Sequence, residues 1–469
     1  MILRGSVLGP LALALVLGVP AWARPAKAKA PARPNILVIL ADDLGAHDLG
    51  VDGSPFHCTP RLDALAKASV RFTSAYAASP VCSPTRASLM TGRHPARVGI
   101  TDWIGAPSVP FEGTRTPANG TALPPDAPTL GEVFKAEGYA TGYVGKWHLG
   151  IAEAHPRERG FQWTFAVNGA GQPASYHAPY QADRPSLQDV PDLEGAEGHL
   201  TDRLTDGALQ FLAREKDHPW LLVVSHYAVH TPLQPPKEGL EAWKGRARAA
   251  EGEAEGVGQT RRSQGDAAYG ALLEHLDTAT GRLLDGVKAM GLDRNTVVVF
   301  VSDNGGLSTL EGRPGPTSNA PLRAGKGWLF EGGIRVPFFI KAPGLRPRKV
   351  ATPVRSEDLM ATLLDLAGLP LRPEIHLDGW SLGPLVRGGD LPQRGMLWHY
   401  PHVHGSGSRP ASALREGDLK LVLPWSGPAM LFDLAADPGE TRNLAPERPD
   451  AVKRMSEALR ARLREMGRP

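Results

Sequence analysis

The chain has 469 residues, of which 42% are hydrophobic and 22% are charged, and this is the composition of an ordinary globular protein. The length suits one large domain together with a smaller one. The net charge of +3, with histidine counted as neutral, gives no strong electrostatic field, so we expect no nucleic-acid partner.

The first residues have the pattern of a secretory signal peptide. Arg4 supplies a positive charge, residues 7–19 form an apolar stretch, and Ala21-Trp22-Ala23 fits a cleavage site. The alternative, a transmembrane anchor, needs about 20 apolar residues, and this stretch is shorter. We therefore expect a signal peptide at residues 1–23, a basic linker at residues 24–34, and a secreted or periplasmic mature protein with no membrane partner.

Strand and helix patterns alternate through the larger part of the chain. Residues 35–41 form a continuous apolar run, which is typical of a strand buried on both faces. Further strands are expected at residues 139–144, 220–225, 296–301 and 336–340, and helices at residues 60–69, 129–137, 201–215, 266–290 and 357–367. The alternation predicts an α/β fold in which helices sandwich a large, mostly parallel sheet.

The C-terminal segment has a different pattern. Short strands separated by turns are expected at residues 395–400, 411–415, 420–423 and 430–434, followed by a helix at residues 449–466. This predicts a small antiparallel sheet with one helix. We place the boundary near residue 388, which gives a large domain at residues 35–388 and a C-terminal subdomain at residues 389–469. Residues 241–264 are charged and lack periodicity, so we expect a mobile surface loop there.

Polar side chains stand where four of the expected strands end. In an open α/β sheet, ligands collect beyond the carboxyl ends of the strands. Oxygen ligands from Asp and Asn suit a hard cation such as Ca²⁺ or Mg²⁺, whereas Zn²⁺ favours His and Cys. Taken singly, each group also fits a helix cap, a turn or a structural histidine. The groups are Asp42 and Asp43, then His148, then His226 and His230, then Asp303 and Asn304.

Residues 82–86, Cys-Ser-Pro-Thr-Arg, form the most specific pattern in the chain. This run resembles the Cys-x-Pro-Ser/Thr-Arg signature of type I sulfatases, within the alkaline-phosphatase-like superfamily. Residues 142–150, Gly-Tyr-Val-Gly-Lys-Trp-His-Leu-Gly, and residues 325–337, which begin with Gly-Lys, are also similar to that family. The resemblance extends over nearly the whole mature chain and implies the alkaline-phosphatase-like fold.

The resemblance implies that Cys82 is oxidised to Cα-formylglycine, whose hydrate is the nucleophile. A formylglycine-generating maturation enzyme would read Pro84 and Arg86 in the unfolded chain. The only other cysteine is Cys58. One alternative is a disulfide between the two cysteines. We favour a modified Cys82 and a single Cys58, because only Cys82 lies in a specific motif.

The same resemblance assigns roles to the polar groups. One Ca²⁺ ion per chain would be bound by Asp42, Asp43, Asp303, Asn304 and the modified residue 82. Arg86 would hold the modified side chain, and His148 would hydrogen-bond the hydrate. Lys146, His230 and Lys326 would contact the sulfate. On chemical grounds, the leaving alcohol also needs a proton from a general acid such as His230. The physical chemistry agrees, because a cation with Lys and Arg stabilises charge on the sulfuryl oxygens as the S–O bond breaks.

One segment near the C-terminus bears on the choice of substrate. Residues 398–407 contain aromatic residues and three histidines, of which His402 and His404 are candidate substrate contacts, although a metal-binding tract or a polar loop would look the same. We favour a sulfated carbohydrate over a simple aryl sulfate. Two alternatives stay open: a phosphonate or phosphodiester hydrolase of the same superfamily, and a non-catalytic protein that binds sulfated glycans.

Overall fold

The structure is a computed structural model that describes residues 1–2, 33–113, 116–180, 193, 195 and 197–468. The segments predicted as signal peptide and linker lie outside the described residues, apart from Met1, Ile2, Arg33 and Pro34. The residues from Arg33 to Pro469 form one compact unit. Within the described part of the chain, no helix is both long and apolar enough to cross a membrane.

An eight-stranded sheet forms the centre of this unit, with the strand order β13-β2-β12-β9-β1-β6-β4-β5. All pairs are parallel except the two that involve β12, so the sheet is mostly parallel, as the sequence predicts. The strands are β1 (Asn35–Ala41), β2 (Val70–Phe72), β4 (Ala140–Gly145), β5 (Trp163–Phe165), β6 (Trp220–Ser225), β9 (Thr296–Ser302), β12 (Phe338–Lys341) and β13 (Arg348–Val350).

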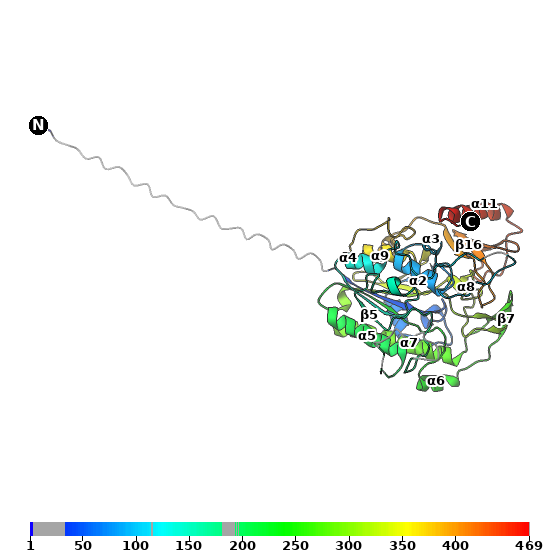
Figure 1. Ribbon diagram of the computed structural model, residues 1–469, viewed down its shortest axis with the longest axis horizontal. Helices are drawn as coiled ribbons and strands as arrows, with labels where there is room; N and C mark the ends of the chain where they lie inside the picture. The colour runs from blue at the N-terminus through cyan, green and yellow to red at the C-terminus, as the bar shows by residue number, and fades with distance from the viewer. Residues whose placement is uncertain (3–32, 114–115, 181–192, 194, 196, 469) are drawn as a thin grey trace. The chain divides into compact units, whose positions relative to one another are not determined.

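Helices cover both faces of the sheet (Figure 1). Alternate side chains of β1 enter two separate hydrophobic cores, because successive residues of a strand point to opposite faces. Ile36 packs in the core with residues of α2, α4, α9 and α10, and Leu37 packs in the core with residues of α1, α5 and α7. The helices are α1 (Pro60–Lys67), α2 (Cys82–Thr91), α4 (Leu130–Ala136), α5 (Leu200–Glu215), α7 (Ala267–Ala289), α9 (Asp358–Leu366) and α10 (Gly383–Arg387).

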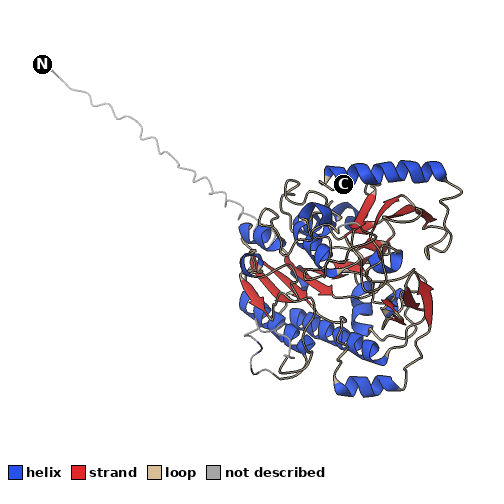
Figure 2. Ribbon diagram, turned by 45° about the vertical axis from the view of Figure 1, so that its right-hand side comes forward, coloured by secondary structure: helices blue, strands red, loops and turns tan. Residues whose placement is uncertain are grey.

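The C-terminal segment forms a second, antiparallel sheet with the order β15-β16-β17-β18. Its strands are β15 (Met396–Tyr400), β16 (Ala411–Glu416), β17 (Leu419–Pro424) and β18 (Met430–Asp433). The last helix, α11 (Pro449–Glu465), buries Met455 and Leu459 against Leu414 and Leu421 of this sheet, and the two lie together in Figure 2. The antiparallel sheet with one helix is confirmed, and the domain boundary near residue 388 stays a prediction.

A buried ion cluster connects the C-terminal sheet to the rest of the unit. The Nζ atom of Lys420 on β17 lies 3.0 Å from Glu331 and 2.8 Å from Glu440. Glu331 begins the short helix α8 (Glu331–Ile334), and it also accepts a hydrogen bond of 2.7 Å from Tyr76. All three ionic side chains are fully buried. The segment that follows Lys326 is therefore tied to the second sheet by paired charges.

The prediction of a mobile loop at residues 241–264 is wrong. This segment contains the end of α6 (Lys237–Lys244) and a hairpin of β7 (Gly252–Glu255) and β8 (Gly258–Arg261). The hairpin pairs with β10 (Thr309–Glu311), which pairs with β11 (Arg313–Pro314). Because β7 is polar and exposed, the strand lacks the apolar alternation that would have revealed it.

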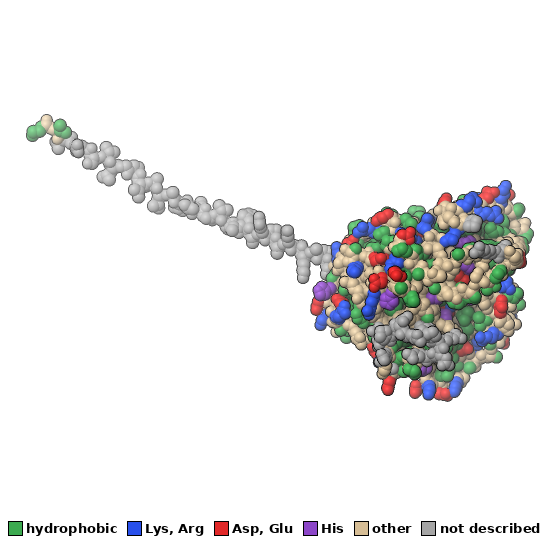
Figure 3. Space-filling model, in the orientation of Figure 1, with side chains coloured by type: hydrophobic (Ala, Val, Ile, Leu, Met, Phe, Trp, Pro, Cys, Tyr) green, Lys and Arg blue, Asp and Glu red, His purple; other side chains and the backbone are tan. Residues whose placement is uncertain are grey.

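The remaining described elements are short. They are the paired strands β3 (Ala75–Tyr76) and β14 (Val354–Arg355), the helix α3 (Pro95–Val98), and the 3-10 turns η1 (Gly50–Asp52), η2 (Ala152–Ala154) and η5 (Asp293–Asn295). On the face drawn in Figure 3, basic and acidic side chains are interspersed.

Candidate active site

The carboxyl ends of neighbouring strands place the predicted polar residues at one edge of the large sheet. Asp42 and Asp43 follow β1, and Asp303 and Asn304 follow β9, which pairs with β1. Lys146 follows β4, and His230 follows β6. The backbone amide of Asp43 donates to Oδ1 of Asp303 at 3.2 Å, so the two strand ends are joined.

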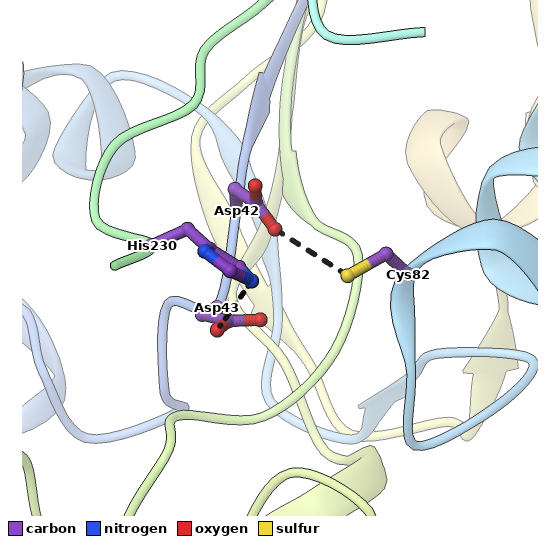
Figure 4. Close-up of side chains that lie close together, drawn as sticks. All are labelled: Asp42, Asp43, Cys82 and His230. Carbon is purple, nitrogen blue, oxygen red and sulfur yellow. Dashed lines mark hydrogen bonds and ion pairs between the residues drawn. The ribbon is translucent and has the colours of Figure 1, made fainter. Parts of the chain in front are cut away.

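Cys82 is the first residue of α2, and its thiol points at this edge (Figure 4). Its Sγ atom lies 3.7 Å from Oδ1 of Asp42. Every residue of α2 is buried, and Cys82 is 2% exposed. One potential ligand atom from each of Cys82, Asp42, Asp43 and His230 lies within 4.8 Å of the others. The helix N-terminus also favours negative charge at this position.

Arg86 lies one turn along α2 from Cys82 and is anchored by residues at the carboxyl ends of the strands. Its Nε atom donates to Oδ2 of Asp303 at 2.8 Å, and Nη1 donates to the carbonyl of Lys146 at 2.8 Å and to Oγ of Ser225 at 2.7 Å. Burial alone would lower the pKa of Arg86, but Asp303 and Asp42 raise it above its ordinary value. Arg86 is therefore a fixed positive charge beside residue 82.

Two lysines neutralise the neighbouring carboxylates. The Nζ atom of Lys146 lies 2.6 Å from Oδ2 of Asp42, and that of Lys326 lies 2.8 Å from Asp43. Burial would raise the pKa of Asp43, but Lys326 and His230 lower it below its ordinary value. Burial raises the pKa of Asp42 well above its ordinary value; Lys146 opposes this shift and Asp303 adds to it.

The donor set fits a hard cation. Nδ2 of Asn304 donates to Oδ1 of Asp43 at 2.8 Å, so the side-chain oxygen of Asn304 takes no part in this bond. That oxygen, Oδ1, is buried and has no hydrogen-bond partner among the described residues. A buried acceptor without a partner is costly unless something binds it. Together with the oxygens of Asp42, Asp43 and Asp303, it makes an oxygen-rich site of the kind Ca²⁺ prefers.

His148, which contacts Ser83 near the start of α2, has a strained backbone conformation. Its φ angle is 57°, in the left-handed region that a residue with a Cβ atom seldom adopts. Its Nε2 atom lies 3.0 Å from the carbonyl of Ile104, and its Nδ1 atom has no partner among the described residues. Burial, followed by the charge of Lys146, lowers the pKa of His148 well below its ordinary value, so the ring is neutral.

Two residues that support His148 were missed by the sequence analysis. Ser83 donates to the carbonyl of His148 at 2.9 Å and accepts from the amide of Ile104 at 3.0 Å. Gly171 lies against the ring, because a Cβ atom there would come 2.4 Å from Cε1 of His148. Ser83 lies inside the cysteine motif, which was the available signal; nothing in the local sequence marks Gly171.

The predicted substrate contacts separate in the structure. His402 is 5% exposed, and its Nε2 atom lies 2.8 Å from Oγ1 of Thr101, in a buried hydrogen-bonded position. His404 packs beside Gly327, where a Cβ atom would come 2.3 Å from its Nδ1 atom, so it is adjacent to Lys326. Trp398, an aromatic residue of the same segment, is fully buried and donates to the carbonyl of Ala77, so it offers no surface to a substrate.

The two cysteines are not joined. Cys58 is exposed and Cys82 is buried, and both are unpaired within the described structure. Among the strand-end residues, His148, His226 and Asp303 lie outside the group formed by Cys82, Asp42, Asp43 and His230.

A buried thiol, a carboxylate edge and fixed cations at the ends of parallel strands define a site for the hydrolysis of an anionic ester. The family described as Sulfatase matches residues 34–369, and the chain belongs to this family. A second description, N-sulphoglucosamine sulphohydrolase, C-terminal, matches residues 324–468. The chain is accordingly a sulfuric ester hydrolase.

Named relatives agree with this assignment. The chain is 32% identical to arylsulfatase A from Homo sapiens, over 92% of this chain and 86% of the relative. It is 34% identical to N-acetylgalactosamine-6-sulfatase from Sus scrofa, over 79% and 69% of the two chains. The solved structure of Ps i-CgsB has a TM-score of 0.74 at 28% identity, covering 92% of this chain and 93% of that one, and it was also solved with k-i-k-neocarrahexaose.

Proposed function

We propose that this sulfatase hydrolyses sulfate esters of carbohydrates, with formylglycine at position 82 as nucleophile and Ca²⁺ as cofactor. The observation that carries the proposal is the position of Cys82, whose thiol lies 3.7 Å from Asp42 at the start of a fully buried helix. A structural cysteine needs no carboxylate beside it, whereas a nucleophile activated by a cation does.

The chain's own residues would hold both groups. Asp42, Asp43, Asp303 and the free carbonyl oxygen of Asn304 would bind the Ca²⁺, which supplies positive charge to the sulfuryl oxygens and lowers the pKa of the attacking hydroxyl. Arg86 would keep residue 82 against that edge. The second hydroxyl of the formylglycine hydrate allows the enzyme to release sulfate without a separate hydrolysis of the ester.

Lys146, Lys326 and His230 would act on the substrate. In the structure, Lys146 contacts Asp42 and Lys326 contacts Asp43, so each ammonium lies at the edge where a sulfate group would dock. The Nε2 atom of His230 lies 3.6 Å from Oδ2 of Asp43, which orients the ring toward the same edge. His230 would protonate the departing alcohol, and the neutral His148 would accept a proton from the hydrate.

The burial of α2 bears on how residue 82 is modified. A maturation enzyme must reach the thiol and read Pro84 and Arg86, yet all of these are buried in the folded protein. The oxidation would therefore precede folding, while the segment is still extended. The signal-peptide pattern at residues 1–23 supports a mature enzyme in the periplasm or outside the cell.

The carbohydrate preference is supported by the relatives and by one residue. The pig relative is named for an N-acetylgalactosamine sulfate, and Ps i-CgsB was solved with an oligosaccharide. His404 lies next to Lys326, which supports a role in contacting the group that carries the sulfate. The buried position of His402 makes it a support for the loop rather than a direct contact.

Sulfate release from monosaccharide sulfates and 4-nitrophenyl sulfate, compared with phosphate release from 4-nitrophenyl phosphate, tests the proposal. We expect sulfate release to dominate, with a higher kcat/KM for a sugar sulfate than for the nitrophenyl ester, and Cys82→Ala to abolish it. A faster phosphate reaction would support the phosphonate or phosphodiester alternative. Binding without turnover would support the glycan-binding alternative, and a preference for the nitrophenyl ester would contradict only the carbohydrate assignment.

A further inference from the structure

A second group of metal-ligating side chains lies away from the catalytic edge, between α5 and α7. Ligand atoms of His199, Asp202 and His275 lie within 4.8 Å of one another. His199 precedes α5, Asp202 lies in the first turn of α5, and His275 is on α7. These two helices lie on the same face of the sheet (Figure 1). Nothing in the sulfatase reaction proposed above uses these residues.

The contacts inside this group bring nitrogen and carboxylate atoms together. The Nε2 atom of His275 lies 3.0 Å from Oδ2 of Asp202, and the rings of His199 and His275 have centroids 4.5 Å apart. The Nε2 atom of His199 lies 2.9 Å from the carbonyl of Gln234, while Nδ1 accepts a longer contact of 3.3 Å from the amide of Thr201. Metal-bound histidines commonly donate their second ring N–H to a backbone carbonyl in this way.

His226 supplies an independent observation. Its side chain is fully buried, and neither ring nitrogen has a hydrogen-bond partner among the described residues. Leaving a buried imidazole unsatisfied costs about 1–3 kcal/mol per polar group. Burial lowers the pKa of His226 to about 4, and the neighbouring charges that act on it are those of His275 and Asp202. His226 is therefore a buried, neutral imidazole near this group, with both ring nitrogens unpartnered among the described residues.

We propose that His199, Asp202 and His275 form a structural zinc site, close to the unpartnered ring of His226. Nitrogen ligands with one carboxylate favour Zn²⁺ over Ca²⁺, which takes oxygen ligands and belongs at the catalytic edge. Oδ2 of Asp202 faces His275 at 3.0 Å, and the longer contact of 3.6 Å between Oδ1 and Arg282 is the one that a bound ion would replace. The side chains of Asp202 and His275 are partly exposed, which gives the ion a route of entry.

The zinc ion would brace the segment that carries His230. That segment begins at His226 and reaches Gln234, whose carbonyl contacts His199. Tyr176 stacks on His199 with ring centroids 5.4 Å apart, and its hydroxyl donates to the carbonyl of His230 at 2.9 Å. The ion would thus stabilise the Gln234 end of this segment and, through Tyr176, the backbone of His230, without touching the substrate.

Zinc titration by calorimetry, in excess Ca²⁺ and in a Cys82→Ala background, tests this inference. That background removes the catalytic thiol as a competing zinc ligand and keeps the test separate from the proposed reaction. We expect one zinc ion per chain and a rise in Tm on binding. His275→Gln combined with Asp202→Asn should weaken the affinity at least about 100-fold, whereas substitution of the exposed His218 by Gln should leave it unchanged.

Two outcomes would overturn the inference. One is the absence of zinc binding in the Cys82→Ala protein. The other is zinc binding of equal affinity in the variant that lacks both His275 and Asp202. Because both side chains are partly exposed, we expect that variant to fold. The single change His275→Gln gives a second, milder test, in which zinc affinity should also fall. Circular dichroism checks that each variant is folded.

Discussion

The Nζ atom of Lys146 lies 2.6 Å from Oδ2 of Asp42, and both side chains are shielded from solvent. Breaking a buried pair by removing one partner costs about 3–5 kcal/mol. Here Asp42 would keep only the longer contact of 3.8 Å with Arg86. Lys146→Met should therefore make the protein depend more strongly on Ca²⁺ for its stability.

The measurement is Tm in Ca²⁺ and in EGTA. We expect the difference between the two to be larger in Lys146→Met than in the wild type, because the ion replaces the missing positive charge. The exposed Lys244, changed to Met, is the matched control and should behave as the wild type. An unchanged Tm of Lys146→Met in EGTA would show that the pair contributes nothing to stability.

Asp303 joins the proposed metal site to Arg86, with 2.8 Å between its Oδ2 atom and Nε of Arg86. Asp303→Asn keeps the shape of the side chain but removes the charge. We expect Ca²⁺ affinity to fall at least about 100-fold and activity to fall with it. Calorimetric Ca²⁺ titration checks this, with the exposed Asp293→Asn as control. Retained affinity would remove Asp303 from the metal site.

His230 is proposed to protonate the leaving alcohol. The loss of activity on replacing His230 should therefore depend on the substrate. A sugar alkoxide needs a proton to leave, whereas nitrophenolate is stable without one. His230→Gln should therefore lower kcat by about 10²–10⁴-fold on a sugar sulfate and by much less on 4-nitrophenyl sulfate. Equal losses on both substrates would exclude the general-acid role and leave His230 as a binding residue.

His94 makes the folded protein sensitive to acid. Burial, followed by the charge of Arg355, lowers its pKa from 6.5 to about 4. The folded state keeps the ring neutral, whereas the unfolded chain takes up a proton below pH 6.5. The free energy of unfolding is therefore fully retained above pH 6.5 and falls as the pH approaches 4. The shift corresponds to about 3 kcal/mol.

Substitution at His94 tests this pH dependence. His94→Gln can keep the contacts with the amide of Ala96 and the carbonyl of Leu397, each 3.1 Å long in the wild type. We expect the free energy of unfolding to fall less steeply between pH 6.5 and 4 in this variant than in the wild type. Chemical denaturation at several pH values measures it, and identical pH dependence in the two proteins would contradict the assignment.

Much of the fold was predictable because its strands are buried on both faces. The run at residues 35–41 is apolar throughout, and β1 occupies these same residues at the centre of the sheet. The hairpin of β7 and β8 was not predictable, because its partner β10 is distant in sequence and β7 is exposed. The helix α2 was also hidden, since all its residues are buried and no polar face marks its period.

The site was predictable as a set of strand-end residues, and its connections were not. Asp42 and Asp303 could be placed at one edge because parallel strands end together. The bond from Ser83 to His148 and the contact of Gly171 with that ring depend on loops, whose paths follow from tertiary packing. The burial of Trp398 was likewise unpredictable, because its strand β15 packs against Tyr76, which is distant in sequence.

The mass of the tryptic peptide of residues 72–86, taken from active enzyme, tests the central claim most directly. This peptide contains Cys82 as its only cysteine. If residue 82 is formylglycine, the peptide is lighter than its sequence mass by two hydrogens and by the difference between sulfur and oxygen, and an aldehyde reagent labels it. A fully active enzyme whose peptide has the unmodified cysteine mass would contradict the proposed nucleophile.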